Sequence, residues 1–189
     1  DINSYKIRDL IFLYIDLSDS VAIAEKLGII KFSQFLRQYH QHVFLQATYF
    51  DAKVYQVLGD GVILYWVNND VNFIKSIKLF YSVKLALTQK QDAFIHYFNQ
   101  ATSIKGVIHA GEVIEVRLPN KHKSFQGDAI NTVGRLICYA NKRKNELITT
   151  LSLNINVESI YKFNLLGGVG LKGKQELIGI VEITENYHH

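Results

Sequence analysis

Runs of apolar residues, each ended by glycine or by polar residues, divide the chain into short segments that are typical of strands. Ile7–Asp16 is the first such segment. Lys53–Leu58 and Val62–Val67 flank Gly59–Gly61, and two apolar runs around a glycine-rich turn predict a hairpin. Further strands are predicted at Ile104–His109, Glu112–Leu118, Leu147–Leu151, Tyr161–Leu165 and Glu176–Ile183.

Other segments repeat their apolar residues with the period of a helix, about 3.6 residues per turn. Val21–Leu27 follows three candidate N-cap residues at 18–20, and Gly28 is expected to end this first helix. Lys31–Tyr49 continues with the same period. Two more helices are predicted, one capped by Asn68, Asn69 and Asp70 that extends to Leu87, and one capped by Asp128 that extends to Ala140.

The order of these elements is β-α-β-β-α-β with further strands and helices, which indicates the α+β class. We expect a ferredoxin-like βαββαβ core, with an antiparallel sheet and helices on one face. No linker, repeat or low-complexity segment interrupts the chain, so 1–187 is expected to form a single domain. The terminal pair 188–189 is interpreted as a candidate tag remnant, and the chain is expected to be a piece of a longer protein because it begins without Met.

Composition narrows the class of protein. Of the 189 residues, 48% are hydrophobic and 20% are charged, as in soluble globular proteins. The net charge of +4 comes from scattered Lys and Arg without interleaved aromatic residues, so we expect no nucleic-acid partner. No apolar run is long enough to span a membrane, so we expect no membrane contact from this segment, although a longer parent protein could be anchored. The single cysteine, Cys138, is expected in the core and fits a cytoplasmic location.

Two acidic residues stand at the ends of predicted strands. Asp16 closes the first strand, and Asp60 lies between two glycines at the hairpin turn. An Asp-Gly pair is most often only a turn. If the two strands are neighbours, however, the carboxylates meet, and like charges about 4 Å apart repel by about 4 kcal/mol at an effective dielectric near 20. Such a pair predicts a site for a divalent cation with oxygen ligands.

Amide and basic side chains supply candidate contacts for an anion. Asn131 and Arg135 are four residues apart and therefore share one face of their predicted helix. Lys172 and Lys174 lie in a glycine-rich loop predicted at Gly167–Lys174. A neutral donor beside a fixed cation suits the charge that develops on a phosphoryl group. A solvated helix face and a flexible basic loop are the alternative interpretations.

Together these segments resemble the catalytic domain of the class III nucleotidyl cyclases, the adenylate and guanylate cyclase family. The resemblance spans Phe12 to Leu177 in five blocks that follow the family's order: FLYIDLSDSVAIAEKLG, VYQVLGDGVILYW, GVIHAGEV, FQGDAINTVGRLICYAN and LKGKQEL. It implies the cyclase fold and the conversion of a nucleoside triphosphate to a 3′,5′-cyclic nucleotide second messenger with release of pyrophosphate.

The resemblance also implies a role for each matching residue. Asp16 and Asp60 would hold two divalent cations, Mg²⁺ or Mn²⁺, with the Leu17 carbonyl as a further ligand. Asn131 would orient the ribose, and Arg135 would stabilise charge on the α-phosphate. Further nucleotide contacts are implied for Lys172, on the β- and γ-phosphates, and for Ser20 and Asp128 at the starts of their helices.

The family builds each active site from two subunits, with the metal acids on one and the Asn/Arg pair on the other. This chain carries both sets. The resemblance therefore implies a homodimer with two shared active sites and an inactive monomer.

The residues that would contact the base depart from the family's usual pattern. Gln56 stands four residues before Asp60, where adenylate cyclases usually have lysine and guanylate cyclases glutamate. Ser124 stands seven residues before Asn131, where Asp or Thr is common. Neither side chain is charged, so both fit adenine, uracil or cytosine, and guanine loses most. The resemblance favours ATP, with UTP or CTP, the substrates of bacterial antiphage cyclases, as the alternative. Asp19 replaces a frequent glycine and is expected to cap the helix.

Two other functions are open alternatives. A catalytically silent regulatory module would keep the fold and the nucleotide, but such modules usually lose a metal acid or the Asn/Arg pair, and this chain has all four residues. A diguanylate cyclase has related chemistry and a GG(D/E)EF turn. The turn GDGVI lacks the second acid and the Phe of that motif.

Overall fold

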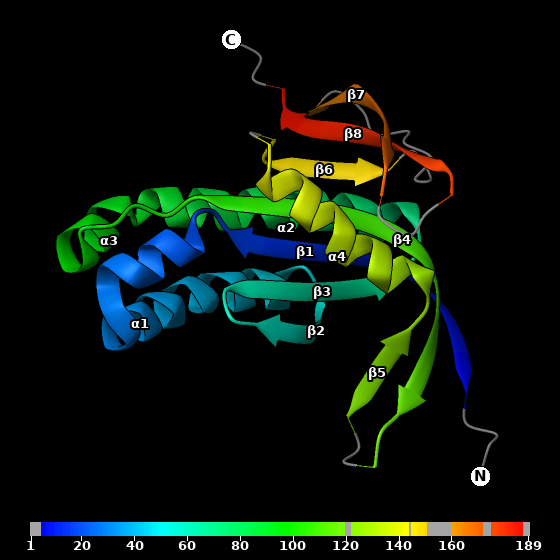
Figure 1. Ribbon diagram of the computed structural model, residues 1–189, viewed down its shortest axis with the longest axis horizontal. Coiled ribbons are helices and arrows are strands. Elements are labelled where there is room, and N and C mark those ends of the chain that lie inside the picture. Colours follow the sequence, from blue (N-terminus) through cyan, green and yellow to red (C-terminus); the bar gives the residue numbers. More distant parts are fainter. Residues whose placement is uncertain (1–4, 120–121, 144, 151–159, 172–174, 187–189) are drawn as a thin grey trace.

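The computed structural model describes residues 5–119, 122–143, 145–150, 160–171 and 175–186. Helices pack against one eight-stranded sheet (Figure 1). The strands are β1 (Lys6–Leu17), β2 (Lys53–Leu58), β3 (Gly61–Val67), β4 (Ile104–Arg117), β5 (Lys123–Gln126), β6 (Leu147–Thr150), β7 (Tyr161–Gly170) and β8 (Leu177–Glu185). The helices are α1 (Ser20–Tyr49), α2 (Asp70–Gln89), α3 (Gln91–Phe98) and α4 (Asp128–Asn141).

The sheet has the order β2-β3-β1-β4-β6-β8-β7, and β5 pairs with β4 beyond this path. β1 lies in the middle and pairs antiparallel with β3 on one side and with β4 on the other. Only β4 and β6 run parallel among the described strand pairs. The α+β class and the βαββαβ core expected from the sequence are confirmed.

The two faces of the sheet are covered by different helices. Ile11, Leu13 and Ile15 of β1 join the core under α1, α2 and α3, whereas Leu10 and Phe12 pack on the side of α4. In Figure 1, α4 lies in front of the sheet and α2 behind it. The expectation that all helices share one face is therefore wrong for α4. The central strands are apolar on both faces, so each face needs a helical cover.

Gly28 divides α1 as the sequence predicts. Its backbone (φ 72°, ψ 168°) is not helical, and the helix resumes beyond it and continues to Tyr49. A positive φ is accessible to glycine at little cost. Asn69 also acts as predicted, because its side chain accepts a hydrogen bond from the Asn72 N–H at the start of α2 (2.8 Å).

Several elements differ from the sequence-based expectation. α3 and β5 were not predicted, and β5 forms a hairpin with β4. β7 continues to Gly170 through a bulge near Gly167, where the sequence predicts a loop. Cys138 is exposed rather than buried, because it follows the buried pair Leu136 and Ile137 on the helix and turns away from the sheet.

Gly106 of β4 gives a stability prediction. A Cβ at this position would lie 2.6 Å from Phe80 Cδ2 and 2.9 Å from Leu147 Cδ1, both in the core. Gly106→Ala should therefore lower the free energy of unfolding by about 1–3 kcal/mol, measured by urea denaturation. The matched control is Gly134→Ala on α4, where nothing lies within 4 Å of the added Cβ. We expect this control to gain about 0.5–1 kcal/mol, because alanine favours a helix interior. Equal stability of Gly106→Ala and the wild type would contradict this packing.

Candidate active site

Two carboxylates from different parts of the chain meet near the end of β1. Asp16 precedes the last residue of β1 and lies on the α4 side of the sheet, and Asp60 occupies the tight turn between β2 and β3. Asp60 Oδ2 accepts a hydrogen bond from the Leu17 N–H (3.2 Å). The carboxyl group of Asp16 is close enough to that of Asp60 to form a hydrogen bond with it. The structure therefore brings together Asp16, Leu17 and Asp60.

Local sterics explain the glycines on both sides of Asp60. Gly59 has a φ of 61°, which allows the chain to turn within two residues. Gly61 lies under the ring of Tyr14, and a Cβ there would be only 2.5 Å from the ring. Burial, and then the charges of Asp16 and Asp60, raise the pKa of Tyr14 to about 12, so Tyr14 is neutral beside the two acids.

The acid pair is electrostatically strained without a cation. Burial, followed by the hydrogen bond and the charge of Asp60, raises the pKa of Asp16 from 3.8 to about 7. Hydrogen bonds from Asn141 and the Leu17 backbone act in the opposite direction but are outweighed. A divalent cation bound by the two carboxylates would stabilise their charged forms and so remove the need for a proton on Asp16.

The donor set fits Mg²⁺ or Mn²⁺ with a phosphate ligand. No cluster of three or more His, Cys, Asp or Glu that could hold a metal occurs among the residues that the structure describes. A caged metal site is therefore not formed by that part of the chain. Mg²⁺ usually binds one or two carboxylates and completes its octahedral coordination with water and substrate phosphates. Asp16 lines an open cleft and has Asp60 next to it, so the two carboxylates match this pattern.

A cleft of about 680 Å³ opens beside Asp16. Residues 16–22 and 103–105 line it, and one side is completed by Asn141 at the end of α4 and by Arg143 just beyond that helix. Its other charged residues include Asp19, Glu25 and Glu146, so carboxylates outnumber cations in the lining. A bare triphosphate would be repelled there, whereas a triphosphate carrying metal cations would not.

The loop that begins α1 forms the floor of this cleft. Asp19 is the N-cap residue, but its backbone is left-handed (φ 58°) and its side chain makes no capping hydrogen bond. The expectation that Asp19 caps the helix through its side chain is therefore wrong. Ser20 begins the helix, and the buried hydroxyl of Ser18 has no hydrogen-bond partner among the described residues. The first N–H groups of a helix and a spare hydroxyl are suitable donors for a phosphate.

Asn131 and Arg135 lie on the outward side of α4. Asn131 is exposed and Arg135 half-buried, while the stripe that faces the sheet is apolar. Asn141, at the end of the same helix, contacts Asp16. Arg135 lies six residues before Asn141, which is about 9 Å along the helix axis. The structure thus holds the Asn/Arg pair together but presents it away from the acids of its own chain.

The two predicted base contacts each lie next to one member of an aromatic pair. Gln56 is exposed and follows Tyr55, at a bulge in β2. Ser124 is half-buried in β5 and precedes Phe125. Phe125 donates its backbone N–H to the Tyr55 hydroxyl (3.1 Å), and the two rings lie 4.7 Å apart. This contact ties β2 to β5 and so links the segments that carry Gln56 and Ser124.

The structure gives less support for the other two predicted site residues, Asp128 and Lys172. Asp128 is the first residue of α4, and the N-cap position predicted for it belongs to Gly127. Lys172, together with Lys174, lies outside the described residues.

Sequence reasoning missed two residues of the cleft, Lys105 and Asn141. Asn141 Nδ2 donates to Asp16 Oδ2 (2.9 Å), and Lys105 is the cross-strand neighbour of Asp16 in the β1–β4 pair. Lys105 is the second residue of a predicted strand and Asp16 the last residue of another, but only the register of the sheet shows that the two residues are paired. The Asn141 contact spans 125 residues and has no local pattern.

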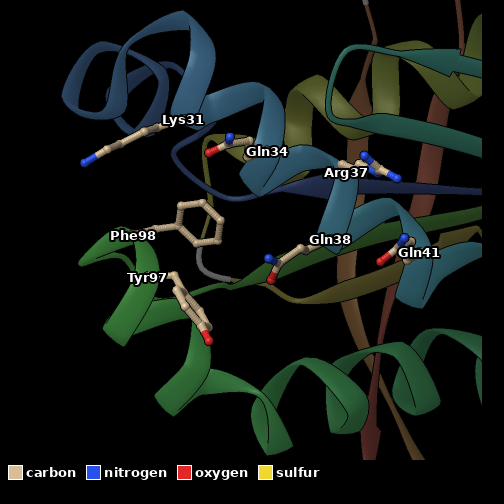
Figure 2. A pocket seen from close by; sticks show the side chains of 7 residues that line it. All are labelled: Lys31, Gln34, Arg37, Gln38, Gln41, Tyr97 and Phe98. Carbon is tan, nitrogen blue, oxygen red and sulfur yellow. The ribbon is translucent and has the colours of Figure 1, made fainter.

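A second hollow, of about 420 Å³, lies between α1 and α3 (Figure 2). Its polar wall comes from α1, with Gln34, Gln38 and Gln41 along one side of the helix and the side chains of Lys31 and Arg37 extending away from it. Phe98 and Tyr97 of α3 form the opposite wall. None of the site residues predicted from the sequence lies in this hollow.

The chain was compared with family models, curated proteins and solved structures. No family model matches the chain. Adenylate cyclase 2 of Rhizobium meliloti (strain 1021) is 19% identical over 182 residues, which cover 94% of this chain and 50% of that protein. The chain thus spans about half the length of the curated relative that it matches.

Two solved structures are similar over nearly their whole length. The adenylyl cyclase CyaB from P. aeruginosa has a TM-score of 0.85 at 12% identity, with 97% of each chain covered. The guanylate cyclase domain of RhGC from Catenaria anguillulae, solved in complex with GTP, has a TM-score of 0.79 at 13% identity and covers 96% of this chain and 100% of that one. The resemblance stated from the sequence is confirmed at the level of the fold. None of the helices in the described part of the chain is long and apolar enough to cross a membrane.

Proposed function

We propose that this chain, which has the fold of class III adenylyl and guanylyl cyclase catalytic domains, is a nucleotidyl cyclase. It would convert a nucleoside triphosphate to a 3′,5′-cyclic nucleotide and pyrophosphate. The observation that carries the proposal is the meeting of Asp16 and Asp60 beside the cleft at the start of α1. The GTP bound to the guanylate cyclase domain named above supports a nucleoside triphosphate as the substrate.

In the reaction, the ribose 3′-hydroxyl would lose its proton to solvent, its oxygen would bond to the α-phosphorus, and the bond from the α-phosphorus to the departing pyrophosphate oxygen would break. Mg²⁺ or Mn²⁺ on Asp16, Asp60 and the Leu17 carbonyl would lower the pKa of the 3′-hydroxyl and neutralise charge on the leaving group. Asp16 would give up its proton when the pair binds a cation, so the two acids that repel each other alone would become a ligand set.

The cleft supplies the contacts for the triphosphate. The start of α1, with its first N–H groups, lines the cleft, and the buried Ser18 hydroxyl has no hydrogen-bond partner among the described residues. Arg143 adds a cation at its edge. Lys172 remains a predicted partner of the β- and γ-phosphates.

The outward position of Asn131 and Arg135 supports a shared site. Within one chain these side chains face away from the sheet, so they are available to a second molecule. In a homodimer with two-fold symmetry, each chain would give its acids to one site and its Asn/Arg pair to the other. Asn131 would orient the ribose, and the guanidinium of Arg135 would stabilise the charge that develops on the α-phosphate.

ATP is the proposed substrate, with UTP or CTP as the alternative. Gln56 and Ser124 both donate and accept hydrogen bonds and carry no charge, so they do not select against adenine or a pyrimidine. The test is incubation of the protein with ATP, GTP, CTP and UTP separately, each with Mn²⁺ or Mg²⁺, and identification of the product by mass. A cyclic nucleotide from any of the four supports the proposal. Binding of all four without release of pyrophosphate would instead support the silent module.

Gln56 gives a prediction about base selection. Gln56→Glu places a carboxylate where guanine offers its N1 and amino donors, so the rate with GTP relative to ATP should rise by about ten-fold or more. The ratio of kcat/KM values for the two substrates measures the change. The matched control is Gln38→Glu, which makes the same substitution in the hollow between α1 and α3. An unchanged ratio in Gln56→Glu would remove Gln56 from the base site.

A further inference from the structure

The last residue of α4 contacts the acid pair. Asn141 Nδ2 donates a hydrogen bond to Asp16 Oδ2 at 2.9 Å, although the two residues are 125 positions apart in the sequence. The Asn141 side chain is exposed, so water is an alternative hydrogen-bond partner for its amide. The position of the helix end therefore keeps the amide beside the Asp16 carboxylate.

Lys105 holds that helix end in place. Its ammonium group donates to the carbonyl oxygens of Ala140 (2.9 Å), Asn141 (3.3 Å) and Arg143 (2.5 Å). A cation at the C-terminus of a helix is favourable because the unpaired carbonyls there carry partial negative charge. Lys105 is also the cross-strand neighbour of Asp16. These three residues are thus linked in a closed loop of contacts. Strand pairing joins Asp16 to Lys105, the Lys105 ammonium bonds to the Asn141 carbonyl, and the Asn141 amide bonds to Asp16.

This loop determines how the Asp16 carboxylate can rotate. The amide of Asn141 occupies Oδ2, and the Leu17 N–H is bound to Asp60 on the neighbouring side. With Oδ2 engaged by the amide, the other oxygen, Oδ1, would be the one to bind a cation, and the cation would replace the hydrogen bond between the Asp16 and Asp60 carboxyl groups. An amide suits this role better than Lys or Arg, because a neutral donor orients the carboxylate without neutralising the charge that attracts the metal.

We propose that Asn141 is a positioning residue of the metal site, which holds Asp16 in the orientation that binds the cation. The proposal rests on the proposed function only in taking Asp16 as a metal ligand. The side chain of Asn141 contacts the Asp16 carboxylate rather than a group that would react, and the sequence resemblance gives it no role.

Direct metal binding tests the proposal without catalysis. Mn²⁺ is titrated into wild type, Asn141→Ala and Asn145→Ala, and free Mn²⁺ is counted by electron paramagnetic resonance. Asn145 is a matched control, because its amide also donates to a carboxylate, Glu182 Oε1 (2.6 Å), away from the acid pair. We expect Asn141→Ala to weaken Mn²⁺ binding by about 10–100-fold and Asn145→Ala to leave it unchanged. Circular dichroism in EDTA checks that both variants are folded.

A kinetic measurement separates positioning from general damage. In Asn141→Ala, the Mn²⁺ concentration for half-maximal activity should rise by more than the maximal rate falls. Equal Mn²⁺ binding by wild type and Asn141→Ala would overturn the proposal and leave the cyclase function intact. Equal weakening in both variants, or no Mn²⁺ binding by the wild type, would overturn it as well. Metal binding that depends on Asn141 in a protein that makes no cyclic nucleotide would instead count against the proposed function alone.

Discussion

Asp60→Ala and Arg135→Ala proteins, each inactive alone, should regain about a quarter of the wild-type rate when they are co-expressed in equal amounts. Each substitution removes a group that acts on the developing charge, so each homodimer should lose about 10²–10³-fold or more in kcat. In the mixed dimer, the intact acids of one chain face the intact Asn/Arg pair of the other. One site is then complete and the second lacks both groups.

The fraction recovered follows from random assembly. About half of the dimers would be mixed, and each mixed dimer has one of two sites, so the rate should approach a quarter of the wild type. The structure supports this arrangement because Asn131 and Arg135 lie on the outward side of α4, while Asn141 at its end contacts the acids of the same chain. One helix would therefore serve two sites.

The control pairs two lesions in the same half of the site. Asp16→Ala co-expressed with Asp60→Ala leaves every site without one of its two metal acids, so no recovery is expected from any dimer. Recovery in this control would show exchange of activity by another route. Mixed dimers of Asp60→Ala and Arg135→Ala can be purified through two different tags. If these dimers are inactive, the proposal of a shared site is wrong.

The acid pair could be placed from the sequence because its position depends on local rules. A strand that ends in Asp16 and a glycine-flanked turn at Asp60 are both visible as short patterns, and adjacent strands often pair. The structure indeed brings these residues together, from strands that pair through Ile15 and Val62. The break at Gly28 was accessible for the same reason, since it depends on one residue and its neighbours.

The remaining features depend on contacts between distant segments. The apolar stripe of α4 packs on the face of β1 that carries Leu10 and Phe12. Because both faces of β1 are apolar, no local sequence pattern predicts which of them α4 covers. Cys138 was placed in the core because its neighbours are apolar, but its helical phase puts it outside. The Asn141 contact required both the end of α4 and the register of β1 with β4, so long-range geometry determined it.

Asp60→Asn should abolish activity and, without metal at pH 8, raise the melting temperature by about 2–4 °C. The wild-type acid pair is the reason. The pKa of Asp16 is raised to about 7, first by burial and then by its hydrogen bond with Asp60 and the charge of Asp60. An uncharged Asn at position 60 removes the repulsion, and its side-chain oxygen can still accept the Leu17 N–H.

The sign of the pH dependence follows from proton binding. Between about pH 4 and pH 7 the folded protein holds a proton on Asp16 that the unfolded chain has lost. The stabilisation from this proton is complete below the unfolded pKa, and it is lost as the pH rises through the folded pKa. The advantage of Asp60→Asn should therefore appear at pH 8 and vanish near pH 5. We expect about 1 kcal/mol, less than the full pKa shift implies, because solvent screens a partly exposed pair.

Metal should reverse the order of stability. Mn²⁺ is expected to bind the folded wild type through both carboxylates, so it should raise the wild-type melting temperature more than that of Asp60→Asn. Melting curves at pH 5 and pH 8, with EDTA or with Mn²⁺, measure all four conditions. The matched control is Asp51→Asn, which breaks a surface ion pair with Lys75 (2.7 Å) and should change stability little in any of them. An Asp60→Asn protein that melts below the wild type in EDTA at pH 8 would show that the two carboxylates do not repel. The acid pair would then give no electrostatic reason to expect a bound cation.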